Sequence, residues 1–370
     1  DSVIRADGRI ENLSSGSSAA ALRISGTNIP VDKRLGRVMP ADMRGIYADW
    51  KPEGKISFET KDLEINTGRD SNTTIDASGS IELHDIGLAT AVEVNELSGR
   101  MDINEISYST KEGIEKFTAE MRGLSVLLAK RLISDIEAKI EQRPAAEISV
   151  DKLVGDIYGG RVSGQITLKE RKAGKPVYSL QAGFNKVDLS ELLAAGRNDG
   201  LEENEHTAGT LEGSLSVSGT VGDVQSRSGR LRLRILDMKV GRLSPLAKVL
   251  YVLKLTDPGD FAFNRMLVDG YIKGQRLLLS KVDISGKGLA FYGGGWVDLA
   301  AQDVDMQLIA RGSRLATAEP SIFQSLAEGL GGAVVRIDVT GDLEDPEVET
   351  KALPVIEESL EILGAEPDEP

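Results

Sequence analysis

Apolar and polar residues alternate along most of this chain. The segment 303–311 is the plainest case, because Val304, Met306 and Leu308 occupy alternate positions and polar residues such as Asp305 stand between them. Such alternation is typical of a β-strand with one apolar face and one solvated face. The pattern leaves two possibilities open. The apolar faces could pack against one another in a closed core, or they could line a surface for something that is not protein.

The first 110 residues form short alternating segments separated by Gly, Asn and Asp turns. Strands spaced in this way predict an antiparallel meander. The alternation changes phase after Phe58 and again after Ile103, which indicates a bulge at each point. The apolar positions expected to share a face are Ile56 with Phe58, Leu63 with Ile65, Ile81 with Leu83, and Met101 with Ile103 and Ile106.

Residues 127–141 break this pattern. Leu128, Leu132, Ile136 and Ile140 recur every fourth residue among charged positions, which predicts an amphipathic helix. We expect this helix to cap one end of a sheet. Docking on a membrane surface is the alternative, although the mixed charges differ from the Lys- and Arg-rich face of such helices.

Other short helices are expected further along the chain. Ser190 is a plausible N-cap for one of them, and Ser244 followed by Pro245 is a well-formed start signal for another. The expected helices lie at 187–196, 244–253 and 319–332.

These patterns divide the chain into four parts. The polar stretch 196–209 is the clearest loop and marks the principal boundary. The parts are an N-terminal β segment at 1–115, an amphipathic helix with β-hairpins at 116–200, a C-terminal β region at 201–352 and an acidic tail at 353–370.

Composition excludes several classes of function. With 44 Lys and Arg against 58 Asp and Glu, the net charge is −14, unlike the concentrated basic surface of a nucleic-acid binder. The chain has no cysteine, which excludes disulfides, thiolate metal sites and cysteine nucleophiles. His84 and His206, the two histidines, have no metal-like neighbours in sequence and are expected at the surface. The sequence contains no signal peptide and no run of 18 apolar residues.

An ordered series of glycine-flanked strands resembles a known family. The segments "KLVGDIYGGRVSGQITL", "VDLSELLAAG", "GTLEGSLSVSGTVGD" and "VDGYIKGQRLLLSKVDISGKGLAFYGGGWVDLAAQDVDMQLIAR" follow one another as in the AsmA-like proteins. No single motif is specific, and their order carries the resemblance. It covers residues 147–348, whereas residues 1–110 share only the general pattern of short alternating strands and turns.

The resemblance implies a bridge-like lipid transfer protein of the repeating β-groove, or β-taco, type. The implied fold is mainly β, with a long curved antiparallel sheet that forms an open apolar groove and a few short amphipathic helices. The implied function is to shield phospholipid acyl chains between the inner and outer membranes, with no catalysis, cofactor or metal. The implied setting is the periplasm, with inner-membrane anchoring through an N-terminal segment absent from this chain. Expected partners are phospholipids, membrane surfaces and envelope proteins that join exposed β edges.

The groove interpretation selects particular residues. Glycines at 293–295 interrupt a strand-like segment and favour bulging and sharp bending. Arg232 and Arg234 could contact anionic headgroups, but such a pair is more often a solvated outer face with acidic neighbours. The candidate groove-lining residues are Leu231, Leu233, Ile235, Val282, Ile284, Val304, Met306 and Leu308.

Two other classes of protein compete with a lipid carrier. A β-rich envelope scaffold that assembles other proteins would have closed sheets and no continuous cavity. An enzyme could use carboxylate pairs such as Asp303 and Asp305 for acid–base or metal chemistry. Their i, i+2 spacing on a strand, however, is what the solvated face of a sheet already requires.

Overall fold

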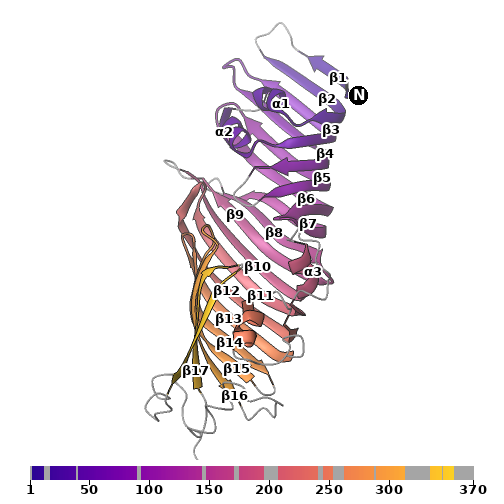
Figure 1. Cartoon of the computed structure of the whole chain (residues 1–370). Helices are drawn as coiled ribbons and strands as arrows, with labels where there is room; N and C mark the ends of the chain where they lie inside the picture. The colour runs from indigo at the N-terminus through magenta and orange to yellow at the C-terminus, as the bar shows by residue number, and fades with distance from the viewer. Residues whose placement is uncertain are drawn as a thin grey trace, which may run out of the picture. The chain divides into compact units, whose positions relative to one another are not determined.

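The chain is mainly β, as predicted. The computed structural model describes residues 2–11, 17–38, 41–89, 93–143, 147–170, 175–195, 207–240, 245–252, 262–286, 289–312, 334–343 and 345–353. Within these residues, hydrogen bonds join 18 strands into one open antiparallel sheet, and only short helices interrupt it (Figure 1). The chain divides into two compact units, which are described one at a time.

Unit 1 contains residues 1–184 together with 219–222. Its strands pair with their neighbours in chain order, so the unit is the antiparallel meander that the sequence predicts. The strands are β1 (Val3–Glu11), β2 (Ser18–Pro30), β3 (Glu53–Thr67), β4 (Thr73–Leu88), β5 (Val94–Ser109), β6 (Gly113–Leu128), β7 (Arg131–Arg143), β8 (Glu147–Ile157), β9 (Gly160–Lys169) and most of β10 (Val177–Asp188). The helices α1 (Lys33–Val38) and α2 (Ala41–Trp50) lie between β2 and β3.

Both predicted bulges of unit 1 are confirmed. In β3 the register with β4 shifts between Thr60 and Asp62. In β5 the register with β6 shifts between Ile103 and Glu105. Each bulge adds one residue to its strand, so apolar positions on either side of it keep the same face although their parity differs.

The predicted amphipathic helix at 127–141 is wrong. This segment ends β6, turns at Ala129 and Lys130 and continues as β7. Both turn residues have positive φ, 48° and 64°, as in a type I′ hairpin, but Ala-Lys lacks the Asn-Gly signature of that turn.

The four-residue spacing had a different cause. Ile136, Ala138 and Ile140 alternate along β7, and every second member of an alternating series also recurs every fourth residue. A register shift then lets Ile133 pair with Val126 while Ile136 pairs with Leu124. A bulged strand therefore imitated the apolar stripe of a helix.

Unit 2 contains residues 185–218 and 223–370. Its strands are β11 (Ala208–Thr220), β12 (Asp223–Lys239), β13 (Ala262–Lys273), β14 (Arg276–Gly286), β15 (Leu289–Asp298), β16 (Asp303–Gly312), β17 (Val334–Asp342) and β18 (Glu347–Leu353). Strands β12 to β18 again pair in chain order. The helices are α3 (Leu189–Ala194) and α4 (Pro245–Val252).

The predicted helix near 190 is present, but its N-cap is Asp188 and not Ser190. The Asp188 carboxylate accepts hydrogen bonds from the Glu191 amide (3.1 Å) and the Ser190 hydroxyl (2.7 Å). Burial raises the pKa of Asp188, but these hydrogen bonds outweigh it and leave the pKa below its ordinary value. The carboxylate of Asp188, two residues before Ser190, is thus the acceptor that caps the helix.

Helix α4 begins at Pro245, as the start signal predicts. Several other predictions fall outside the described residues. These are the cap Ser244, residue His206, the loop 196–206, the helix at 319–332 and the tail from 354 onward.

The glycines at 293–295 act differently from the prediction, because the bulge lies in the neighbouring strand. Leu279 pairs with Gly295 and Val282 with Gly293, so the extra residue belongs to β14. A Cβ at Gly293 would overlap the carbonyl oxygen of Gln307 on β16. These glycines therefore let adjacent backbones approach closely.

Candidate functional site

A continuous apolar surface crosses six strands of unit 1. Residues directly opposite on antiparallel strands point to the same side of a sheet. The register therefore assigns each apolar residue of β2 to β7 to a row that runs across the strands. The central row consists of Gly26, Phe58, Ile81, Met101, Met121 and Ala138.

Strand β4 contributes one residue to each row, and these residues are two apart along the strand, so that all the rows lie on the same face. They are Ile75, Ala77, Gly79, Ile81 and Leu83. We call the surface that these rows form the unit 1 apolar face. Its further rows are Leu22, Leu63, Ala77, Ile106 and Phe117; Ala20, Ile65, Ile75, Tyr108 and Ile114; and Gly79, Ile103, Ala119 and Ile140.

The unit 1 apolar face is only partly covered. Every apolar side chain of these rows on β2 to β5 is half-buried. On β6 and β7 the small side chains Ala119 and Ala138 are buried, whereas Phe117, Met121 and Ile140 are half-buried. A protein core buries its aliphatic side chains, so partial exposure over four neighbouring strands leaves apolar surface available to a ligand.

The opposite face of unit 1 is charged. Its side chains form short ion pairs both along one strand and between neighbouring strands. Hydrogen bonds from Lys139 and Arg143 lower the pKa of Glu141. Exposed pairs of this kind contribute little stability, but they identify the solvated side of the sheet. The pairs include Arg100 with Asp102 (2.8 Å), Lys116 with Glu105 (2.6 Å) and Lys139 with Glu141 (2.7 Å).

All eight predicted lining residues lie in unit 2, and the register places them on one face of β12, β14 and β16. One row joins Leu233 to Val282 and Leu308 through Val268 and Gly293. The others hold Ile235 with Ile284, Leu231 with Met306, and Val304 with Val297.

Most of this second face is covered. Ile235, Val282, Ile284, Val304 and Leu308 are buried, whereas Leu231, Leu233 and Met306 are half-buried. Ile337, which pairs with Leu308, is fully buried. Helix α4 contacts β18 and buries Ala247 and Leu250 completely. The lipid-lining role of the eight residues stays a prediction.

The outer face of unit 2 explains the alternating arginines. Arg232 forms an ion pair with Asp269 at 2.8 Å, and Arg234 lies 3.9 Å from Glu212. The Arg232 hydrogen bond also lowers the pKa of Asp269. The interpretation as a solvated face with acidic neighbours is confirmed.

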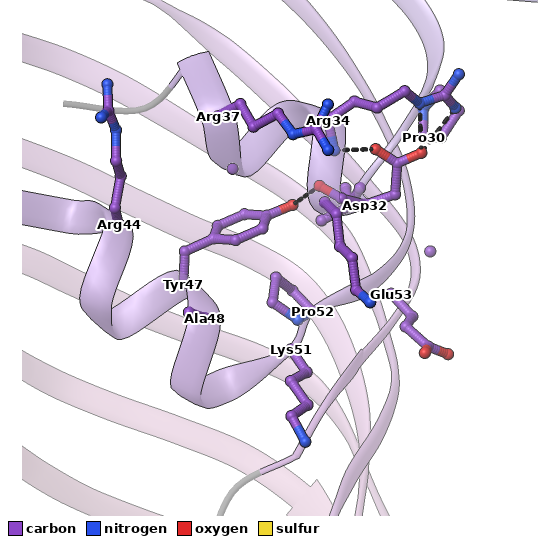
Figure 2. A pocket seen from close by; sticks show the side chains of 14 residues that line it. Pro30, Asp32, Arg34, Arg37, Arg44, Tyr47, Ala48, Lys51, Pro52 and Glu53 are labelled. Atoms are coloured by element: carbon purple, nitrogen blue, oxygen red, sulfur yellow. Dashed lines mark hydrogen bonds and ion pairs between the residues drawn. The ribbon is translucent and has the colours of Figure 1, made fainter. Parts of the chain in front are cut away.

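A basic pocket, which sequence reasoning missed, lies between α1, α2 and the start of β3 (Figure 2). Its volume is about 1100 Å³. The lining includes five cationic side chains and two carboxylates, Asp32 and Glu53. The cations are Lys33, Arg34, Arg37, Arg44 and Lys51, all exposed, and their spacing in sequence is the signal that could have revealed the site.

Hydrogen bonds fix the geometry of the basic pocket. The Tyr47 hydroxyl donates to the backbone oxygen of Asp32 at 2.8 Å and so ties α2 to the start of α1 (Figure 2). Burial and the nearby Asp32 charge raise the pKa of Tyr47. The Arg34 guanidinium donates to the Asp32 carboxylate at 2.7 and 2.9 Å, which lowers the pKa of that carboxyl.

The residues considered for catalysis, His84, Asp303 and Asp305, occupy positions that the sheet itself explains. Nε2 of His84 lies 3.1 Å from Oγ of Ser57, and that hydroxyl also accepts from the Asn28 amide, so it links β2, β3 and β4. Asp303 and Asp305 alternate with the covered apolar residues of β16. The part of the chain that the structure describes holds no group of three or more His, Asp or Glu suited to a metal.

Among the described helices, none is long and apolar enough to cross a membrane. Comparison with protein-family models, with curated proteins and with solved structures gives no match for this chain.

Proposed function

We propose that this chain is a non-enzymatic lipid transfer protein that shields phospholipid acyl chains on the unit 1 apolar face. The observation that carries this proposal is the partial exposure of aliphatic side chains across β2 to β5. The wall is made largely of Ile, Leu, Met and Ala, which suits disordered acyl chains because aliphatic walls impose no directional contacts.

The dimensions and energetics support this proposal. Six strands at about 4.8 Å spacing give a path of roughly 24 Å from β2 to β7. One leaflet of a bilayer has a hydrocarbon depth of about 15 Å, so an acyl chain fits along this path. Removing each CH₂ from water contributes about 0.8 kcal/mol, so a carrier that covers two chains removes most of the barrier to crossing an aqueous gap.

The proposed setting follows the AsmA-like resemblance and not the geometry. It places the chain in the periplasm, between the inner and outer membranes, with anchoring to the inner membrane. The proposed partners are phospholipids, membrane surfaces and envelope proteins.

Strand β1 supports sheet extension by such a protein. In the described residues it pairs along β2, and Ile4 and Ile10 are 65% and 56% exposed. An exposed edge strand with apolar side chains is a template for strand addition.

A scaffold role is the second candidate, and the covered face of unit 2 favours it. Phe263 and Phe291 are each 1% exposed, with ring centroids 6.0 Å apart, as in an ordinary core. A scaffold of this kind would carry no lipid.

Site-specific photocrosslinking separates the two functions. A photoreactive amino acid at Ile81 or Ile103 points to the unit 1 apolar face, whereas the adjacent Ser80 and Asp102 point to the charged face. We expect lipid adducts from the first pair after incubation with phospholipid vesicles, and none from the second. Equal labelling of both pairs, or labelling of neither, would refute the binding of lipid on the unit 1 apolar face.

A further inference from the structure

We propose that the basic pocket binds the phosphate-bearing headgroup of a phospholipid whose acyl chains lie on the unit 1 apolar face. This inference rests on the proposed lipid transfer function and adds a selectivity to it. The pocket would make the carrier prefer phosphate-bearing lipids to neutral lipids with the same acyl chains.

Charge is the first argument. The whole chain carries a net charge of −14, yet five of the seven charged side chains that line this pocket are cationic. One of the two carboxylates, Asp32, is already engaged by Arg34. Arginine binds phosphate oxygens through a planar fork of donors. Arg37 and Arg44 bring such forks to the lining in addition to Arg34, whose donors already bind Asp32. An anionic ligand therefore complements this site.

Connection to the apolar face is the second argument. Ile29 pairs with Ile56, and Ile56 with Leu83, in a further row of half-buried residues on the unit 1 apolar face. Val31 lines the pocket, follows Ile29 by two residues and is buried, and its amide donates to the Gly54 carbonyl at 3.0 Å. On extended backbone, residues two apart share a side and lie about 7 Å apart. The pocket therefore begins about one side chain beyond this row.

Gly54 forms part of the same junction. It lines the pocket, has φ of 126°, and a Cβ there would come within 2.9 Å of Cδ1 of Ile86. The missing side chain leaves room for Ile86, which is buried. The pocket lining itself includes Pro30, Val31, Ala48 and Pro52, so apolar and basic side chains lie together there, as an amphipathic ligand requires.

Size and rigidity are the third argument. A volume of about 1100 Å³ exceeds that of a bare phosphate and accommodates a headgroup with its glycerol. The Tyr47 hydrogen bond holds α1 and α2 together, and the backbone oxygen of Trp50 accepts from the Ala89 amide at 2.7 Å, which ties the end of α2 to β4. Both helices lie beside the N-terminal strands of unit 1 (Figure 1).

The test compares two lipid probes on the full chain. One is a fluorescent diacyl phospholipid, and the other is a diacylglycerol with the same labelled acyl chains. The variant carries Arg37→Glu with Lys51→Glu, which changes two pocket cations. The matched control carries Lys61→Glu with Arg69→Glu, an equal change of charge at exposed positions of unit 1 outside the pocket.

We expect the unmodified chain and the control to bind phospholipid roughly tenfold or more tightly than diacylglycerol. The pocket variant should lose this preference while its affinity for diacylglycerol stays unchanged. Equal affinity of the unmodified chain for both probes would overturn the headgroup site without contradicting acyl-chain binding on the unit 1 apolar face. Binding of neither probe would refute the proposed function itself.

Two further arms complete the test. Inorganic phosphate alone should compete weakly, and full displacement of the lipid at a similar concentration would assign the pocket to free phosphate. Far-ultraviolet circular dichroism checks that the variant is folded, since an equal loss of both probes together with lost β signal would reflect unfolding. In that case the milder pair Arg37→Gln with Lys51→Gln decides the matter, and an unchanged preference there would overturn the proposal.

Discussion

A single charge on the unit 1 apolar face should weaken lipid binding strongly. Ile65 lies in the row with Ala20 and Ile75, and it is half-buried. Its neighbour Asn66 points to the opposite face and is exposed. The variants Ile65→Asp and Asn66→Asp therefore place the same carboxylate one residue apart on the two sides of one strand.

The spacing of the strands sets the magnitude. An acyl chain that crosses the sheet meets one strand about every 4.8 Å, which is roughly four methylenes per strand. Part of the Ile65 side chain is already covered by protein, so we take Ile65→Asp to remove apolar contact from roughly three of these four methylenes. At about 0.8 kcal/mol for each, the loss is about 2.4 kcal/mol, or roughly 60-fold in affinity. Asn66→Asp should change the affinity less than about twofold.

The assay is transfer of a fluorescent phospholipid between two vesicle populations, together with equilibrium binding of the same probe. Thermal unfolding of both variants serves as the control for folding. Equal effects of Ile65→Asp and Asn66→Asp in folded proteins would refute the assignment of the lipid to this face.

Three predictions concern the fold. Gly293→Ala should destabilise unit 2 by about 1–3 kcal/mol in urea unfolding, because its Cβ would overlap the backbone of β16. Gly45→Ala has open space around its Cβ and should stabilise α2 by about 0.5–1 kcal/mol. Equal effects of the two substitutions would contradict the close approach of β15 to β16. Replacing Ala129 and Lys130 by Asn-Gly should stabilise the β6–β7 hairpin by about 1 kcal/mol, since both positions have positive φ, and a loss of stability would contradict the type I′ turn. The pKa of Asp188 is lower in the folded chain than its ordinary value, so its stabilisation is complete above about pH 4 and is lost as the pH falls through the folded pKa. Asp188→Asn should therefore show a smaller loss of stability between about pH 5 and pH 2 than the unmodified chain, and identical acid profiles would exclude this role.

Strands with regular alternation could be predicted from sequence, and so could two of their bulges. The phase changes after Phe58 and Ile103 each correspond to an observed register shift. Failure came at 127–141, where a bulge near Asp135 and a turn without glycine or asparagine imitated a helical stripe. Periodicity alone does not separate these cases, because a strand whose register shifts has no single period.

The site was harder to predict than the fold. Alternation identified the eight lining candidates as one face, but exposure depends on what packs against that face. Leu308 is buried, whereas Ile81, with the same local pattern, is half-buried. The basic residues around Tyr47 are closely spaced in sequence, but only the packing of α1 beside α2 shows that they line one pocket.

Native mass spectrometry with lipid extraction, applied to the purified full chain, tests the central claim most directly. We predict co-purified phospholipid on the unmodified chain, with strongly reduced occupancy in Ile65→Asp and normal occupancy in Asn66→Asp. A folded chain that carries no lipid, even after incubation with phospholipid vesicles, would contradict the account and favour the scaffold.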